Sequence, residues 1–227
     1  MFRYFGKNHG LGVSFVGLLS LRNASRIFCR ELTAAARKRG AIGWLEKTPR
    51  HFCAVDRIRE CIPECSFVHV VREGLAACAS MRDRANRFPG QFGKESGIKF
   101  MSSIWNQAIQ SAAEQYGARD TIVIPYETFV ADPVAVMNRV SRKLNLPDSR
   151  GTSPARPAIG EMFSAYQEPW KASAAGVVHP ANSKASRVFS QHEILELQSR
   201  LNLRLYEKLL KETQIVENVR PLTPRSR

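Results

Sequence analysis

Two short polar segments of the sequence carry residues that can bind or transfer an anionic group. The first runs from Glu46 to His51 (EKTPRH) and directly follows the apolar pair Trp44-Leu45. A carboxylate can take the proton of an attacking hydroxyl, and an ammonium beside it, here Lys47, can meet negative charge that develops on oxygen atoms. The simpler alternative is a polar turn at the end of a strand.

The second polar segment begins at Arg72, after the apolar run 66–71. Ser80 lies eight residues further on, and Arg84 follows one helical turn later on the same helix face. Guanidinium groups bind phosphate through paired hydrogen bonds, and a hydroxyl adds a neutral donor. The spacing fits a phosphate site, although a solvated helix face can carry the same residues.

The elements that would position these residues alternate between helix and strand. Periodicity and end signals predict helices at 22–39, 52–62, 74–88, 99–117, 132–146 and 188–213, strands at 41–45, 66–71 and 121–127, and loops at 88–99 and 147–187. This order indicates an α/β fold with a mainly parallel sheet, where ligands bind beyond the carboxyl ends of the strands. Both polar segments follow predicted strands, which favours a site.

The net charge, the cysteines and the longest apolar run limit the classes of ligand and site that fit this sequence. The 227 residues carry a formal charge of +14, which attracts polyanions such as nucleic acid, anionic lipid or phosphorylated and sulfated small molecules. Five cysteines without a matching His or Cys pair predict reduced thiols, no zinc site and a cytoplasmic protein. The apolar run 10–21 is too short to span a bilayer, and we expect a helix end packed in the core there rather than an export signal.

The order of the motifs resembles that of the sulfotransferase superfamily, whose members use 3′-phosphoadenosine 5′-phosphosulfate. The closest similarity is to the bacterial sulfotransferases related to tyrosylprotein sulfotransferases. The matching pieces are EKTP after one strand, Arg-x7-Ser after the next, Trp-Asn-x-Ala-Ile on a long helix, and a strand that ends in Tyr-Glu. SMRDR and SAAGVVHPAN (173–182) are similar to further segments of that group, and the resemblance runs from Gly43 to the C-terminal helix.

The resemblance implies a single domain over 1–227 with a three-layer, P-loop-like α/β fold. A helical part at 1–42 would precede a nucleotide-binding core at 43–146, a loop-rich nucleotide-gripping segment at 147–187 and the C-terminal helix. The implied reaction moves a sulfonate to a hydroxyl of a tyrosyl peptide, glycan, lipid or small alcohol. It requires no metal, and nucleic acid is not an expected partner.

Site residues follow from the same resemblance. Arg72, Ser80 and Arg84 would hold the 3′-phosphate, Tyr126 would lie against the nucleotide, and Arg187 or Lys184 would supply the basic residue after the gripping loop. Glu46 would be the catalytic base, and Lys47 would contact the sulfonate or the leaving phosphate. In tyrosylprotein sulfotransferases an Asn occupies the position of Glu46. In this sequence, His179 stands where the related sulfotransferases usually have a Lys. We interpret His51 as a packing or supporting residue.

One expected motif has no counterpart. The superfamily grips the 5′-phosphosulfate with a loop of the form P-R-S-G-T-T, and nothing in residues 1–42 matches it. We therefore expect the first strand of the sheet to be missing and the chain to be a truncated or inactive member. The alternative is a non-catalytic basic module that binds nucleotide or nucleic acid. A nucleotide-kinase-like protein fits less well, because G-x4-G-K-[ST] is absent.

Overall fold

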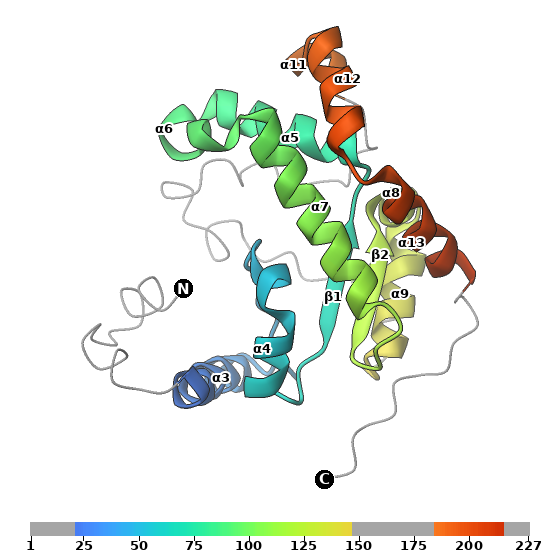
Figure 1. Ribbon diagram of the computed structural model, residues 1–227. Coiled ribbons are helices and arrows are strands. Elements are labelled where there is room, and N and C mark those ends of the chain that lie inside the picture. The colour runs from blue at the N-terminus through green and yellow to red at the C-terminus, as the bar shows by residue number, and fades with distance from the viewer. Residues whose placement is uncertain (1–20, 147–183, 216–227) are drawn as a thin grey trace. The chain divides into compact units, whose positions relative to one another are not determined.

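The structure is a computed structural model that describes residues 21–146 and 184–215 (Figure 1). The chain forms two compact units, Met1–Cys65 and Ser66–Arg227. The run 10–21, apart from its last residue, and the segment 173–182 with His179 lie outside the described residues.

The first unit contains α3 (Leu21–Lys38), the 3-10 turn η1 (His51–Ala54) and α4 (Val55–Cys61). The prediction of the first helix is confirmed, and Gly40 ends it with a φ of +65°. The predicted strand at 41–45 is wrong, because these residues are irregular and Leu45 is 85% exposed. Trp44 instead packs edge-on against Phe28 of α3 and donates from Nε1 to Thr33 Oγ1 at 3.1 Å.

The second unit is built on two parallel strands, β1 (Phe67–Val71) and β2 (Thr121–Pro125), which confirms the expected α/β character and parallel pairing. The register places Phe67 opposite Thr121 and Val71 opposite Pro125. Four elements connect the strands: α5 (Gly74–Arg87), α6 (Pro89–Phe92), η2 (Gly93–Glu95) and α7 (Ile98–Gln115). The predicted loop at 88–99 therefore needs correction, since it holds two short helical turns.

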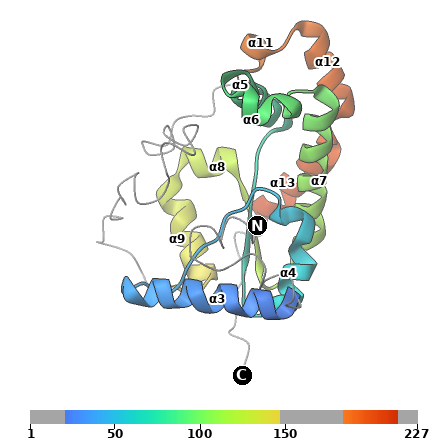
Figure 2. The same cartoon turned by 90° about the vertical axis from the view of Figure 1, so that its left-hand side faces the viewer.

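Helices cover both faces of β2. Ile122 and Ile124 pack with Val136 and Val140 of α9 (Pro133–Lys143), whereas Val123 joins the larger core on the opposite face. That larger core is built from α5, α7, α12 (Gln191–Arg200) and α13 (Leu203–Ile215). Its fully buried residues are Met101, Ile109, Leu197 and Leu209. Figure 2 shows α8 (Tyr126–Ala131) and α9 on one side of the strands and α7 and α13 on the other.

The two faces of β1 are covered unequally. Val71 lies in the larger core, while Val68 and Val70, on the α9 side of the sheet, are 40% and 58% exposed. The strand at 66–71 is confirmed, but only one of its faces is buried. The sheet contains two strands within the described residues.

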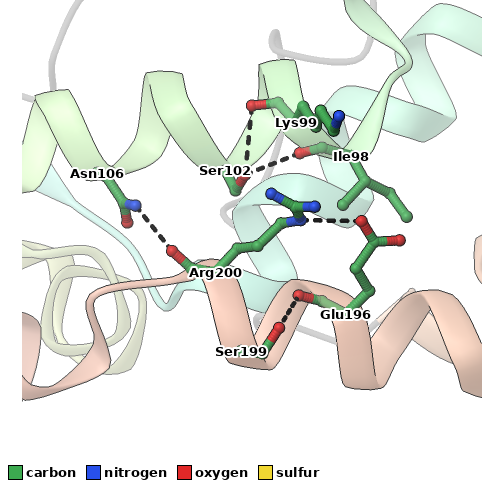
Figure 3. A network of polar contacts seen from close by, with 7 residues as sticks. All are labelled: Ile98, Lys99, Ser102, Asn106, Glu196, Ser199 and Arg200. Carbon is green, nitrogen blue, oxygen red and sulfur yellow. Dashed lines mark hydrogen bonds and ion pairs between the residues drawn. The ribbon is translucent and has the colours of Figure 1, made fainter.

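The C-terminal part contains three helices where the sequence predicts one. It consists of α11 (Ala185–Val188), α12 (Gln191–Arg200) and α13 (Leu203–Ile215), so the single helix at 188–213 is wrong, and residues 185–187 are helical rather than loop. Asn106 of α7 explains the break after α12. It donates to Arg200 O at 2.9 Å (Figure 3), and it accepts from Asn202 N–H at 2.9 Å. Asn202 then caps α13 by accepting from Leu205 N–H at 3.2 Å.

Candidate active site

Strand register brings the first predicted pair of site residues together. Val71 and Pro125 are paired, so the residues that follow them, Arg72 and Tyr126, leave the sheet at the same edge. The Arg72 guanidinium carbon lies 4.7 Å from the centre of the Tyr126 ring, which is a cation–π distance. Tyr126 begins the unpredicted short helix α8 (Tyr126–Ala131).

The backbone around Arg72 is held from two sides. Trp105 Nε1 of α7 donates to Arg72 O at 2.9 Å. The next N–H, that of Glu73, donates to Glu127 Oε1 at 3.2 Å, and Tyr206 O–H of α13 donates to Glu127 Oε2 at 3.2 Å. Burial, and then the nearby Glu127 carboxylate, raise the pKa of Tyr206, which keeps the phenol a neutral donor.

Glu73 and Gly74 set the start of the helix that follows. The Glu73 carboxylate caps α5 by accepting from Leu75 N–H at 2.8 Å and Ala76 N–H at 2.6 Å. A Cβ on Gly74 would lie 3.0 Å from Leu201 Cδ1 and 3.1 Å from Trp105 Cζ2. Glycine therefore lets the helix start close enough to α7 for the Trp105 indole to reach Arg72.

The Arg72 side chain has unused hydrogen-bonding capacity. Its Nε is buried and has no hydrogen-bond partner among the residues that the structure describes. A buried cationic donor without a partner is costly in a folded protein, and an anionic ligand is one way to satisfy it. The end of β1 is therefore suited to bind a phosphate or sulfate group.

Ser80 and Arg84 occupy different surroundings on α5. Ser80 is exposed, and within the described chain no hydrogen bond joins it to Arg72 or Arg84. Arg84 donates from Nη2 to Glu95 Oε2 at 2.8 Å and lies 4.2 Å over the ring of Phe92. Its Nε, like that of Arg72, is buried without a partner in the described residues.

Lys184 and Arg187, the two basic residues that follow the segment 173–182 in the sequence, line one open cavity of about 410 Å³. The other lining residues are Asp83, Arg87 and Val188. Asp83 Oδ2 pairs with Lys184 Nζ at 2.9 Å and with Arg87 Nη2 at 3.3 Å. The hydrogen bond from Lys184 is the main cause that lowers the pKa of Asp83. Three cations face one ionised carboxylate, so the cavity favours an anion.

The polar loop of the first unit is a small hydrogen-bonded cluster. Glu46 accepts from Thr48 Oγ1 at 2.6 Å through Oε1, and its Oε2 lies 2.8 Å from His51 Nδ1. The His51 N–H closes the turn by donating to Thr48 O at 3.0 Å. Lys47, between these residues, is exposed. The loop thus presents a carboxylate, an imidazole and an ammonium within six residues.

Sequence reasoning did not identify several residues of these sites. Asp83 and Arg87 follow Ser80 at helical spacing, so their position on the Ser80 face was readable from the helix period. Glu127 and Tyr206, in contrast, reach the backbone near Arg72 from distant segments, and no local pattern signals that. His51 was seen in the sequence, but its pairing with Glu46 was not expected.

Further features of the described residues bear on function. None of their helices is long and apolar enough to cross a membrane. They contain no group of three or more His, Cys, Asp or Glu side chains placed to hold a metal ion. None of the five cysteines, all of which lie in the described residues, forms a disulfide.

Comparison with known proteins identifies the family. The family model described as "Sulfotransferase family" matches residues 14–150, which is more than half of the chain and includes the Glu46 loop, the end of β1 and the helix α5. Searches of curated proteins and of solved structures found no match. On the strength of the family match, the chain belongs to the sulfotransferase family.

Proposed function

We propose that this protein transfers a sulfonate group from 3′-phosphoadenosine 5′-phosphosulfate to a hydroxyl acceptor. The observation that carries the proposal is the Arg72 guanidinium at the end of β1, stacked on Tyr126, with a buried Nε that lacks a partner in the described chain. The family match supports sulfonate transfer in general, and an anion site beside an aromatic ring supports a phosphorylated nucleotide as the donor.

The proposed nucleotide site uses residues of the second unit. Arg72 and Arg84 would bind the 3′-phosphate through their guanidinium groups, with the exposed Ser80 hydroxyl as a further donor. Tyr126, already stacked on Arg72, would lie against the nucleotide. Lys184 and Arg187 would hold an anionic part of the donor at the cavity beside α5.

The proposed chemistry uses the polar loop of the first unit. The acceptor oxygen forms a bond to sulfur while the bond between sulfur and the bridging phosphate oxygen breaks, so that the leaving phosphate takes the electron pair. Lys47 would meet negative charge on the sulfonate or leaving oxygens, and Glu46 would act in removing the acceptor proton. The acceptor is a hydroxyl of a tyrosyl peptide, a glycan, a lipid or a small alcohol.

Calorimetric titration with adenosine 3′,5′-bisphosphate tests the nucleotide site. We expect the full chain to bind this ligand far better than adenosine 5′-monophosphate. Arg72→Ala is expected to weaken bisphosphate binding by about tenfold to a hundredfold, because hydrogen bonds to charged groups contribute about 1.5–3 kcal/mol. Arg119→Ala, which removes an exposed arginine of the same unit, is the matched control.

Two results would contradict the proposal. One is equal affinity for the bisphosphate and the monophosphate, which would mean that no 3′-phosphate site exists. The other is an unchanged affinity in Arg72→Ala. Transfer of labelled sulfonate from the donor to a panel of hydroxyl acceptors then tests the reaction itself.

A further inference from the structure

We infer that Asp83 competes with the ligand of the cavity beside α5, because its carboxylate already holds cations that a phosphate or sulfate group needs. The cavity is the one lined by Asp83, Arg87, Lys184, Arg187 and Val188. Asp83 therefore lowers the affinity of this cavity for its anion, and Arg87 serves as a third cation for the bound group. The inference rests on the proposed function where the anion belongs to the donor nucleotide, and free pyrophosphate offers the same chemistry.

The carboxylate of Asp83 is shared between two cations through one oxygen. Oδ2 lies 2.9 Å from Lys184 Nζ and 3.3 Å from Arg87 Nη2. Arg187 lines the same cavity and acts on Asp83 through its charge. Three cations thus surround one carboxylate, so the cavity retains positive charge that Asp83 does not neutralise.

Lys184 and Arg87 keep hydrogen-bond donors that Asp83 does not use. An ammonium carries three N–H donors and a guanidinium carries five, while each of these groups makes one contact to Asp83. The side chains of Lys184 and Arg87 are 42% and 52% exposed, whereas that of Asp83 is 24% exposed. An anion from solvent therefore reaches the cations more easily than it reaches the carboxylate.

An ionised Asp83 weakens anion binding in either arrangement of the occupied cavity. If the carboxylate stays in place, it lies near a ligand of the same charge and repels it. If it is displaced, its contacts with Lys184 and Arg87 are lost. The net value of a partly exposed ion pair corresponds to a factor of up to about fivefold in an equilibrium constant. A neutral side chain at this position avoids both costs.

The junction between α5 and α11 does not depend on Asp83 alone. Ala185 of α11 and Phe189, which follows it, are 4% and 6% exposed in the larger core. The Arg82 guanidinium carbon lies 4.8 Å from the centre of the Phe189 ring, and Arg82 Nη2 pairs with Glu193 at 2.9 Å. These contacts hold α11 beside α5 when the carboxylate of Asp83 is displaced or neutralised, so the cavity remains formed.

Calorimetric titration of the full chain with inorganic pyrophosphate, at constant ionic strength, tests the inference without the nucleotide. Asp83→Asn keeps the shape of the side chain and removes its charge, so we expect it to bind pyrophosphate about fivefold more tightly than wild type. Glu207→Gln is the matched control, because it removes the same charge from an exposed position on α13. Its affinity should equal that of wild type.

Arg187→Ala shows whether pyrophosphate occupies this cavity. This variant removes a lining cation without breaking either ion pair of Asp83. Affinity for pyrophosphate should fall by about tenfold, in wild type and in Asp83→Asn alike, because a hydrogen bond between charged groups is lost. Arg119→Ala, which removes an exposed arginine of the same unit, should leave the affinity unchanged.

Urea unfolding gives an independent measurement of the competition. Without ligand, Asp83→Asn should be less stable than wild type, because its contacts with Lys184 and Arg87 lose their charge. The difference should shrink when both proteins are saturated with pyrophosphate, since the variant gains more stability from the ligand that it binds more tightly. A carboxylate with a purely structural role would give the same difference with and without pyrophosphate.

The inference is overturned if Asp83→Asn binds pyrophosphate no more tightly than wild type, if Glu207→Gln tightens binding equally, or if no protein binds pyrophosphate. Repeating the titration with adenosine 3′,5′-bisphosphate separates these outcomes from the proposed function. Tighter pyrophosphate binding by Asp83→Asn, without any bisphosphate binding, would support the inference and contradict the nucleotide site. Bisphosphate binding that needs Arg72, with pyrophosphate binding unchanged in Asp83→Asn, would support the nucleotide site and contradict the inference.

Discussion

At the residue scale, the position of Arg72 depends on its backbone as much as on its side chain. Its carbonyl accepts the Trp105 indole N–H at 2.9 Å, and the following N–H bonds to Glu127 at 3.2 Å. The peptide group between Arg72 and Glu73 is thus held at both its carbonyl and its N–H by residues far away in the sequence. Trp105 is 5% exposed, so it belongs to the core and has this directional role as well.

Replacing the indole tests this role. Trp105→Phe removes the donor and leaves a carbonyl of limited access to water unsatisfied, so we expect the free energy of unfolding to fall by about 1–3 kcal/mol. Affinity for adenosine 3′,5′-bisphosphate should also fall, because the Arg72 backbone loses one of its two restraints. Urea unfolding and calorimetric titration measure the two effects.

The matched control for this prediction is Trp44→Phe. It also removes an indole donor, but its partner is the Thr33 hydroxyl in a half-buried setting where water can replace the lost bond. The loss of stability should be smaller. Equal losses in the two variants would contradict a special role for the bond to Arg72.

At the element scale, ion pairs and caps join helices that are distant in the sequence. Asp83 of α5 pairs with Lys184, which precedes α11, and Arg82 of α5 pairs with Glu193 of α12 at 2.9 Å. The pKa of Glu193 is lowered mainly by its hydrogen bond from the Ser190 backbone, and then by Arg82. Ser190 and Glu193 form a capping box at the start of α12.

Acid should weaken the junction between α5 and α11. The pKa of Asp83 is lower in the folded protein than its ordinary value, so its stabilising contribution is complete above about pH 4 and is lost as the pH falls through the lowered pKa. Asp83→Asn should reduce the free energy of unfolding by about 1 kcal/mol at pH 7, with a much smaller difference near pH 2. Urea midpoints across this range measure it.

Glu207→Gln supplies the control, because it neutralises an exposed carboxylate of α13. Its effect on stability should be near zero throughout the range. A destabilisation by Asp83→Asn that stays constant down to pH 2 would mean that ionisation of Asp83 does not hold the junction. The cause would then be packing.

At the scale of the whole molecule, the charge of +14 distinguishes the proposed function from the alternative of a basic nucleic-acid module. Charge of this sign attracts any polyanion, and such binding weakens steeply with salt because counterions are released. Recognition of a small bisphosphate instead depends on a few oriented guanidinium groups. Salt dependence and the response to Arg72→Ala therefore separate the two modes.

Fluorescence anisotropy with duplex DNA at 50 and 200 mM salt makes this comparison. We expect DNA affinity to fall by about 10³-fold or more if six or more phosphates are contacted, and to be nearly the same in Arg72→Ala. Bisphosphate affinity should change much less with salt and should depend on Arg72. DNA binding that survives 200 mM salt and needs Arg72 would favour the nucleic-acid module.

Local signals explain why most element positions were predictable from the sequence. Asp132 caps α9 by accepting from Ala135 N–H at 2.9 Å, and Gly117, with a φ of +85°, follows the end of α7. These signals act through neighbours a few residues away, so the sequence records them directly. The order of the two strands and the helix between them follows in the same way from hydrophobic periodicity.

The predicted helices and strands are wrong where residues distant in the sequence determine the local backbone structure. The apolar spacing around Leu201 and Leu203 continues through 190–212 and predicts one helix, but Asn106 of α7 satisfies the backbone groups at the break. The run 41–45 is apolar enough for a strand, yet Trp44 turns to α3 instead. Periodicity carries no information about such partners.

The residue types of the candidate site, and therefore its charged groups, were determined by the sequence itself. The sequence places Arg72 after a strand and Ser80 one helical turn before Arg84. It also places Glu46 beside Lys47. Tertiary structure decided the pairings: Arg72 with Tyr126, Asp83 with Lys184, and Glu46 with His51. Strand register, helix docking and the fold of a loop set those distances, because each depends on the three-dimensional path of the backbone rather than on residue type.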